Sequence, residues 1–219
     1  MRAVAAFKGW PAEAFDFYEG LEADNSKAYW TENKAVYEQC VRAPFEALMA
    51  DLASEFGAGK LFRPYRDVRF SVDKSPYKTA QGAVLNHDAG TVYYVALSAE
   101  GLFAASGYYM MAKDQIDRFR KAVASDKTGP PVERIVAKLE KAGYDIGGEA
   151  LRRSPPGYPV DHPRIRLLRH KGVTMSKSWE PAPWVGTASA KPRVVGVFRA
   201  AKPLNDWLDA NVGRAKQPG

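Results

Sequence analysis

The residues with the greatest capacity for chemistry lie in one short basic segment, residues 63–78. It reads Arg63-x-x-Arg66-Asp67-x-Arg69-Phe70-x-x-Asp73-Lys74-x-x-Tyr77-Lys78. Its five lysines and arginines exceed its two aspartates by three charges. Arginine forks bind phosphate or carboxylate through paired hydrogen bonds, and lysine adds a mobile point charge. The segment therefore predicts a site for an anionic small molecule, with ligand contacts from Arg63, Arg66, Arg69, Lys74, Tyr77 and Lys78.

An enzyme built on this segment needs a group that moves a proton while the arginines hold the anion. Asp67 and Asp73 are the carboxylates of the segment. His162 lies between Asp161 and Pro163 in a proline-rich loop and is the third candidate for a general base. A loop histidine also has ordinary structural roles, so the sequence leaves open whether the protein is an enzyme.

Two other interpretations fit the same residues. In the first, Asp67 and Asp73 neutralise arginines that brace the sheet against a helix, which makes the segment a structural network. In the second, the basic surface belongs to a non-catalytic module that binds nucleic acid or protein. Tyr65, Tyr77 and Tyr158 would stack on bases in such a module, although buried tyrosines explain the same pattern.

A second basic stretch follows between residues 149 and 180, where seven cations outnumber three acids. The Gly147–Gly148 turn offers backbone N–H groups that form an anion nest beside Arg152, which adds Arg152 to the candidate ligand residues. The alternative is a solvated helix face next to an ordinary turn.

Several kinds of site are not expected. The three histidines, His87, His162 and His170, stand far apart, and no cysteine or carboxylate cluster has metal-ligand spacing. The sequence has no glycine-rich phosphate loop, no dinucleotide fingerprint and no Gly-x-Ser-x-Gly elbow. Asp73 and Lys74 are adjacent, so they diverge on a strand and do not match a nuclease core. We therefore expect neither a metal nor a cofactor.

The N-terminal elements read as helices. Proline begins a short helix over residues 10–21, and Asn25 or Ser26 caps a longer one whose aromatic stripe is typical of a protein core. Cys40 sits on this stripe, which predicts an inert buried thiol. Pro44 removes one helical hydrogen bond, so a kink or break is expected there.

The middle of the chain, residues 61–109, alternates with a period of two and reads as antiparallel strands. Residues 92–97 and 102–105 flank a turn at residues 98–101, so the apolar run 89–112 is interpreted as a buried hairpin and not as a membrane span. An extended basic segment places Val68, Phe70 and Val72 toward the core and most of its charged residues on the other face.

The remaining elements are expected as helices over 114–123 and 130–142, an edge strand over 144–151 and a loop over 154–163. A short basic helix over 164–171, a strand over 173–178 and helices over 194–198 and 204–208 follow. Helices first, strands in the middle and helices last predict an α+β fold, with a central antiparallel sheet flanked by N- and C-terminal helices. We expect one globular domain over residues 1–213 and a flexible tail over 214–219.

Composition and charge favour one cellular compartment and one kind of partner. The chain has 219 residues, a single cysteine and a formal net charge of +7. No internal disulfide is possible, and the N-terminus does not resemble a signal peptide, so a cytoplasmic protein is expected. The positive charge favours an acidic partner such as a phosphate, an anionic metabolite or nucleic acid.

The basic segment resembles the signature of a widespread family of roughly 220-residue bacterial and fungal proteins, known only as a conserved domain of unknown function. Similar residues run from Phe7 to Leu208, through Phe7-x-Gly9-Trp10-Pro11, Asn25 to Trp30, Asn33–Lys34, Pro44–Phe45, Gly82–Ala83, Gly147 to Leu151, Pro156–Gly157–Tyr158 and Asp161–His162–Pro163. The resemblance implies a shared fold and a functional site in the basic segment. It implies no reaction.

Overall fold

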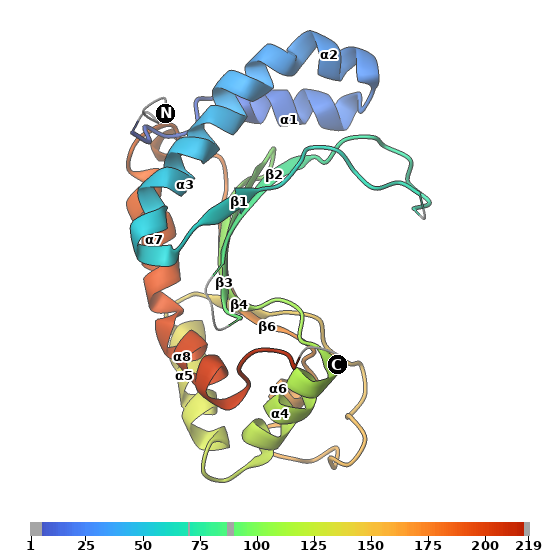
Figure 1. Ribbon diagram of the computed structural model, residues 1–219, viewed down its shortest axis with the longest axis vertical. Helices are drawn as coiled ribbons and strands as arrows, with labels where there is room; N and C mark the ends of the chain where they lie inside the picture. Colours follow the sequence, from blue (N-terminus) through green and yellow to red (C-terminus); the bar gives the residue numbers. More distant parts are fainter. Residues whose placement is uncertain (1–5, 70, 87–89, 217–219) are drawn as a thin grey trace. The chain divides into compact units, whose positions relative to one another are not determined.

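The strands of the computed structural model form one antiparallel sheet, which confirms the α+β fold (Figure 1). The structure describes all residues except 1–5, 70, 87–89 and 217–219. The six strands lie in the order β1-β2-β3-β4-β6-β5. Their bounds are β1 Gly59–Leu61, β2 Ala80–Asn86, β3 Val92–Ser98, β4 Gly101–Tyr108, β5 Asp145–Gly147 and β6 Val173–Trp179.

Helices precede and follow the strands, as the sequence predicts. Before the sheet come α1 Glu13–Ala23, α2 Lys27–Val36, the π-helical segment η1 Tyr37–Arg42 and α3 Ala43–Phe56. Between β4 and β6 lie α4 Lys113–Ala124, α5 Gly129–Lys141 and α6 Ile165–Leu168, and after β6 come the 3-10 turn η2 Pro183–Gly186, α7 Ala190–Ala200 and α8 Lys202–Asn211.

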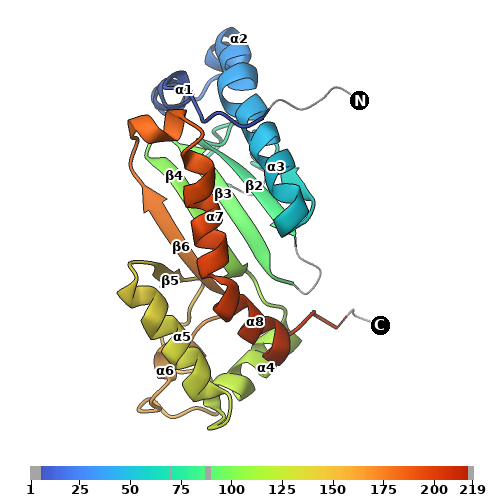
Figure 2. The same ribbon diagram turned by 90° about the vertical axis from the view of Figure 1, so that its left-hand side faces the viewer.

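The chain divides into two compact units. The first comprises residues 1–85, 94–104 and 178–195, and the second comprises residues 86–93, 105–177 and 196–219. Strands β3 and β4 contribute residues to both. In the first unit, α3 lies over one face of the strands (Figures 1 and 2), and its core includes Trp10, whose ring lies 4.9 Å from those of Phe7 and Phe45.

The N-terminal helices begin and bend where the sequence predicts. The Ser26 hydroxyl accepts a hydrogen bond from the Tyr29 N–H at 3.1 Å and caps α2. Pro44 cannot donate to a preceding carbonyl, and the π-helical segment η1 ends just before it. Cys40 in η1 is half-buried, so the expectation of a buried thiol was wrong in degree. Burial still raises the pKa of its thiol, as expected for an unreactive cysteine.

The apolar run 89–112 folds largely as the predicted hairpin. Strands β3 and β4 meet at the expected turn after Ser98, and Val95, Leu97 and Leu102 are almost completely buried. The part of the chain that the structure describes holds no helix with the length and apolar character to cross a membrane.

The basic segment departs from the prediction. Residues 62–79 do not form a strand of the sheet; they make an arm that extends beyond β1 and β2 (Figure 1). Val72 is fully exposed and Val68 only half-buried, so neither side chain enters the core as expected. Phe70 lies outside the described residues. The charged residues of this segment pair within an exposed loop, which alternation alone does not reveal.

The second unit follows the sequence closely. Strand β5 pairs antiparallel with β6 at the edge of the sheet, and Gly143 ends α5 with a positive φ of 79°. The predicted basic helix is shorter than expected, because only Ile165–Leu168 are helical. Of the expected tail, residues 217–219 lie outside the described residues, whereas the Arg214 carbonyl and the Lys216 N–H hydrogen-bond to side chains of α4.

Candidate functional site

The base of the arm, residues 62–66 and 76–79, is paired through its own backbone. Tyr65 and Tyr77 form an isolated antiparallel bridge. On either side of it, the Arg66 N–H donates to the Pro76 carbonyl at 2.9 Å, and the Lys78 N–H donates to the Pro64 carbonyl at 2.8 Å. The base of the arm is therefore an ordered continuation of β1 and β2.

The N-terminal helices α1, α2, η1 and α3, with the turns between them, form what we call the helical layer. Two of its residues fix the base of the arm. The Asn25 side chain donates to the Tyr77 carbonyl at 3.1 Å and accepts from the Tyr77 N–H at 3.0 Å, as a neighbouring strand would. Trp30 of α2 stacks on the Tyr77 ring with centroids 4.4 Å apart and planes 8° apart. Tyr77 is thereby buried and occupied by structural contacts.

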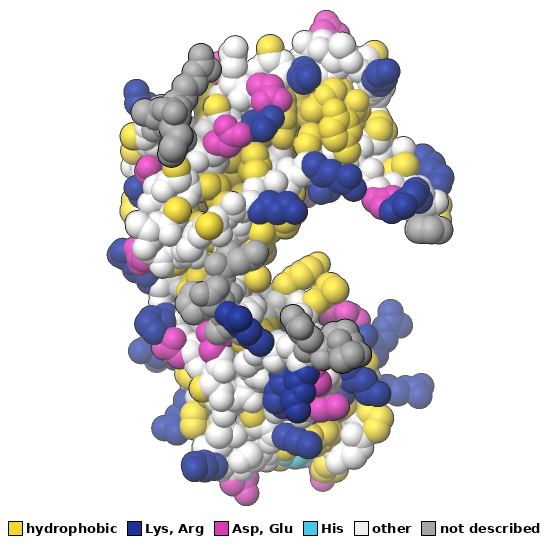
Figure 3. Space-filling view, in the orientation of Figure 1, with side chains coloured by type: hydrophobic (Ala, Val, Ile, Leu, Met, Phe, Trp, Pro, Cys, Tyr) yellow, Lys and Arg dark blue, Asp and Glu magenta, His cyan; other side chains and the backbone are white. Residues whose placement is uncertain are grey.

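Most cations of the arm are bound within the arm. Arg66 pairs with Asp73 at 2.5 Å, and Arg69 pairs with Asp67 at 2.7 Å. The Lys74 ammonium donates to the Val68 carbonyl at 2.9 Å. These groups are largely exposed, with the Arg69 side chain at 77%, and positive and negative side chains lie side by side over the arm (Figure 3). Exposed pairs of this kind contribute little to stability.

The two carboxylates of the arm are poor proton acceptors. Hydrogen bonds from Ser75, followed by the one from Arg66, lower the pKa of Asp73 to about 2. The hydrogen bonds of Arg69 lower the pKa of Asp67. A general base works best with a pKa near the working pH, so these shifts count against a proton-transfer role for either aspartate.

The exposed position of Asp67 leads to a direct prediction. Asp67→Asn should leave the melting temperature almost unchanged, because the residue is exposed and its side-chain hydrogen bonds within the described residues go to the likewise exposed Arg69. Thermal unfolding followed by circular dichroism checks this. A clear fall in melting temperature would show that Asp67 belongs to a structural network after all.

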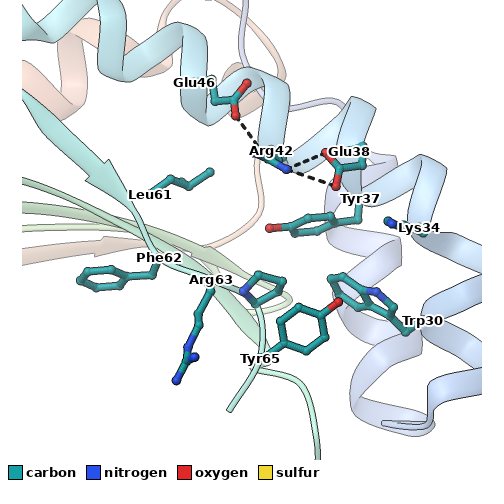
Figure 4. Close-up of a pocket in the computed structure, with 11 residues that line it drawn as sticks. Trp30, Lys34, Tyr37, Glu38, Arg42, Glu46, Leu61, Phe62, Arg63 and Tyr65 are labelled. Carbon is teal, nitrogen blue, oxygen red and sulfur yellow. Dashed lines mark hydrogen bonds and ion pairs between the residues drawn. The ribbon is translucent and has the colours of Figure 1, made fainter. Parts of the chain in front are cut away.

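A cavity of about 420 Å³ lies between the helical layer and the base of the arm (Figure 4). Four of its eleven lining residues are aromatic, with Trp30 and Tyr37 on the helical side and Phe62 and Tyr65 on the strand side. Its other lining residues are Lys34, Glu38, Arg42, Glu46, Leu61, Arg63 and Pro64.

The polar groups of this cavity differ in how they are held. Arg42 lies between two glutamates of its own helix, 3.2 Å from Glu38 and 2.9 Å from Glu46. The Tyr37 hydroxyl donates to the buried Gln81 side chain at 2.6 Å. Burial, together with the nearby charge of Glu38, raises the pKa of Tyr37 to about 12, so this hydroxyl stays protonated at neutral pH.

The two other cations of the cavity, Lys34 and Arg63, form no ion pair among the described residues, although the charge of Arg63 contributes to the lowered pKa of Asp67. Lys34 enters from α2, and Arg63 enters from the strand side. The Arg63 guanidinium points away from Tyr37 and Arg42, toward the other side of the strand (Figure 4). The Arg63 side chain is exposed.

Of the residues that the sequence singled out, Arg63 and Tyr65 line this cavity. Arg66, Asp67, Arg69, Asp73 and Lys74 lie farther along the arm, and Lys78 sits at its base, 5.5 Å from the centre of the Phe62 ring. Arg152 and His162 belong to the second unit. Sequence reasoning correctly took Trp30 and Tyr37 as core residues, and it missed that they and Lys34 lie beside Arg63 in the folded chain.

The second basic stretch has mainly structural partners. Arg166 pairs with Glu140, and Lys171 with Glu149. A Cβ on Gly148, where φ is 116°, would lie 2.1 Å from the Gly172 carbonyl oxygen. This glycine therefore permits a close backbone approach. Arg152 is exposed, and the His162 Nδ1 accepts a hydrogen bond from the Arg164 N–H at 3.0 Å.

Metal ligation has no support in the described residues, which omit His87. No group of three or more histidine, cysteine or carboxylate side chains among them is placed to hold a metal ion.

Comparison with known proteins identifies the family. The model of a conserved hypothetical protein family, DUF2461, matches residues 13–207. The chain belongs to this family. The match spans α1 to α8 and so includes the helical layer, the arm and the cavity between them. A comparison with curated proteins finds no match. Membership in DUF2461 thus assigns the chain no reaction, and the site must be argued from its own geometry.

Proposed function

We propose that this DUF2461 protein binds an anionic small molecule in the cavity at the base of the arm. The observation that carries the proposal is a cavity that combines aromatic residues with two cations, Lys34 and Arg63, that form no ion pair in the described part of the chain. A flat ring of the ligand lies against the exposed Tyr65, and its acidic group contacts Lys34 and Arg63.

The size and lining of the cavity suit such a ligand. Small-molecule sites have volumes of roughly 300–1,000 Å³ and combine apolar walls with a few polar groups that fix orientation. Arg42 is already neutralised by Glu38 and Glu46, so an anion gains most from the other two cations. Arg63 reaches it by a change of rotamer, which is common on binding.

The other cations of the arm attract the ligand in this proposal without contacting it. Arg66, Arg69, Lys74 and Lys78 give the arm a positive excess over Asp67 and Asp73. Exposed charges of one sign raise the local concentration of an oppositely charged ligand and its rate of association. Direct contact is assigned to Arg63 alone among the arm cations. The proposal is one of binding, and it includes no chemical step.

A thermal-shift panel at constant ionic strength tests the proposal, because salt alone screens surface repulsion. Phosphate, sulfate, benzoate, phenyl phosphate, sugar phosphates and nucleotides are compared. A ligand at a hundredfold over its dissociation constant adds about 2.7 kcal/mol of stability, or a rise of roughly 5–10 °C for a chain of this length. We expect ring-bearing anions to give the largest shifts.

Matched variants make the panel specific. Lys34→Gln and Arg63→Gln should lose most of the shift. Lys27→Gln removes the same charge from the exposed first turn of α2 and should keep it. An unresponsive wild type, or equal responses from Lys34→Gln and Lys27→Gln, would overturn the proposal.

A further inference from the structure

A row of aromatic side chains crosses the sheet of the first unit on the face opposite α3. Leu85 of β2 and Met49 of α3 both lie next to Gly59, so Leu85 faces the helix. Side chains alternate along a strand, and Gly82 therefore faces the other way. Tyr94 lies over Gly82, where an added Cβ would be 2.5 Å from the Tyr94 hydroxyl. Tyr94 is thus on the face away from α3.

Two more rings continue this row on neighbouring elements. The Phe62 ring lies 6.2 Å from Tyr94, and Phe103 of β4 lies 6.0 Å from Tyr94 on the other side. All three side chains are partly exposed. We call Phe62, Tyr94 and Phe103 the aromatic row.

Positive charge lies at one end of the aromatic row. The Lys78 ammonium is 5.5 Å from the centre of the Phe62 ring. The Arg63 guanidinium, next along the chain, points away from Tyr37 and Arg42 (Figure 4). Burial and then the positive charge of Arg63 lower the pKa of Lys78. Neither cation forms an ion pair within the described residues.

We propose that the aromatic row is a stacking surface for single-stranded nucleic acid, with Lys78 and Arg63 on the phosphates. Aromatic side chains on an open sheet face stack on unpaired bases, and nearby cations follow the backbone. A duplex keeps its base faces inside the stack, so the row favours a single strand. The formal net charge of +7 complements a polyanion. One base on each of two or three rings matches the length of the row.

This surface meets the cavity only at Phe62 and Arg63, which line both. Lys34, Trp30 and Tyr37 lie on the helical side of the cavity (Figure 4), and neither Tyr94 nor Phe103 is among its lining residues. Lys34→Gln therefore tests the cavity alone, and Phe103→Leu tests the aromatic row alone.

Fluorescence anisotropy with labelled oligo(dT) and oligo(rU), measured over a range of salt concentrations, tests the proposal. Phe103→Leu and Phe62→Leu should each weaken binding by about 5- to 150-fold, which corresponds to the loss of one stacked base. Lys78→Gln should reduce the slope of log affinity against log salt by about 0.7, as expected when one phosphate contact to a single strand is removed. Lys34→Gln should bind the oligonucleotides as wild type does.

Arg69→Gln is the control for charge alone, because Arg69 is exposed on the arm and paired with Asp67. Affinity for Arg69→Gln should stay within about twofold of wild type. Circular dichroism establishes that each leucine variant is folded, and Lys78→Gln gives a surface substitution that does not depend on packing. Three results would each overturn the proposal: no binding at low salt, equal affinity for duplex DNA, or equal loss from Arg69→Gln and Lys78→Gln.

Discussion

Trp30→Ala is expected to lower the free energy of unfolding by about 3–5 kcal/mol, the usual cost of truncating a large aromatic side chain in a core. Trp30 is 5% exposed. Its ring stacks on Tyr77, lies 4.8 Å from Tyr37 and 5.8 Å from Phe17, and also approaches Tyr65. One substitution therefore removes packing from the helical layer, the base of the arm and a wall of the cavity together.

Chemical denaturation measures this effect, and Trp30→Phe provides a matched comparison. Phenylalanine keeps a ring that stacks on Tyr77, so the conservative variant should lose much less stability. Asn25→Ala addresses the arm alone, since it removes both hydrogen bonds to the Tyr77 backbone. A loss below about 1 kcal/mol in Trp30→Ala, outside the expected range, would show that the helical layer does not depend on this residue.

Arg164→Ala is expected to destabilise the second unit strongly, although Arg164 looks like part of a basic surface in the sequence. The residue is only 8% exposed. Its guanidinium donates to the Val123 carbonyl at 2.7 Å and to the Ala124 carbonyl at 3.0 Å, at the end of α4. A buried acceptor left without a donor costs about 1–3 kcal/mol, so the loss of both should exceed the effect of an ordinary surface substitution.

Arg166→Ala is the control for this prediction. Arg166 is two residues away, its side chain is 61% exposed, and it pairs with Glu140 at the surface. Its replacement should change stability by less than about 1 kcal/mol. Equal melting temperatures for the Arg164→Ala and Arg166→Ala variants would contradict a structural role for Arg164.

The sequence predicts much of the fold because apolar periodicity and turn chemistry are local. Ser26, the turn after Ser98, Gly143 and Pro203 mark element ends in the sequence, and each lies at or beside such an end in the structure. Pro44 likewise predicts the disturbance that appears as η1.

The prediction of a sheet strand fails in the basic segment, because the alternation of apolar and charged residues there does not come from a buried face. Asp67 and Asp73 form ion pairs with arginines of the arm. Val68 lies in the arm, outside the strands of the sheet, and is only half-buried. The cavity depends on Trp30 and Lys34 meeting Arg63 from a distant part of the chain. This proximity of residues distant in the sequence results from tertiary packing, so no local sequence pattern predicts it. Arg164 illustrates the opposite error: the sequence suggests an exposed cation, whereas the side chain is buried in the structure.

The most direct test of the central claim, that the cavity binds an anionic small molecule, is a nuclear magnetic resonance titration of the ¹⁵N-labelled protein with phenyl phosphate at constant ionic strength. The account predicts saturable shifts that are largest for backbone amides around Lys34 and Tyr37 and for residues 61–65, and their loss in Lys34→Gln. Shifts confined to the outer arm or to the second unit, or shifts that do not saturate, would contradict it.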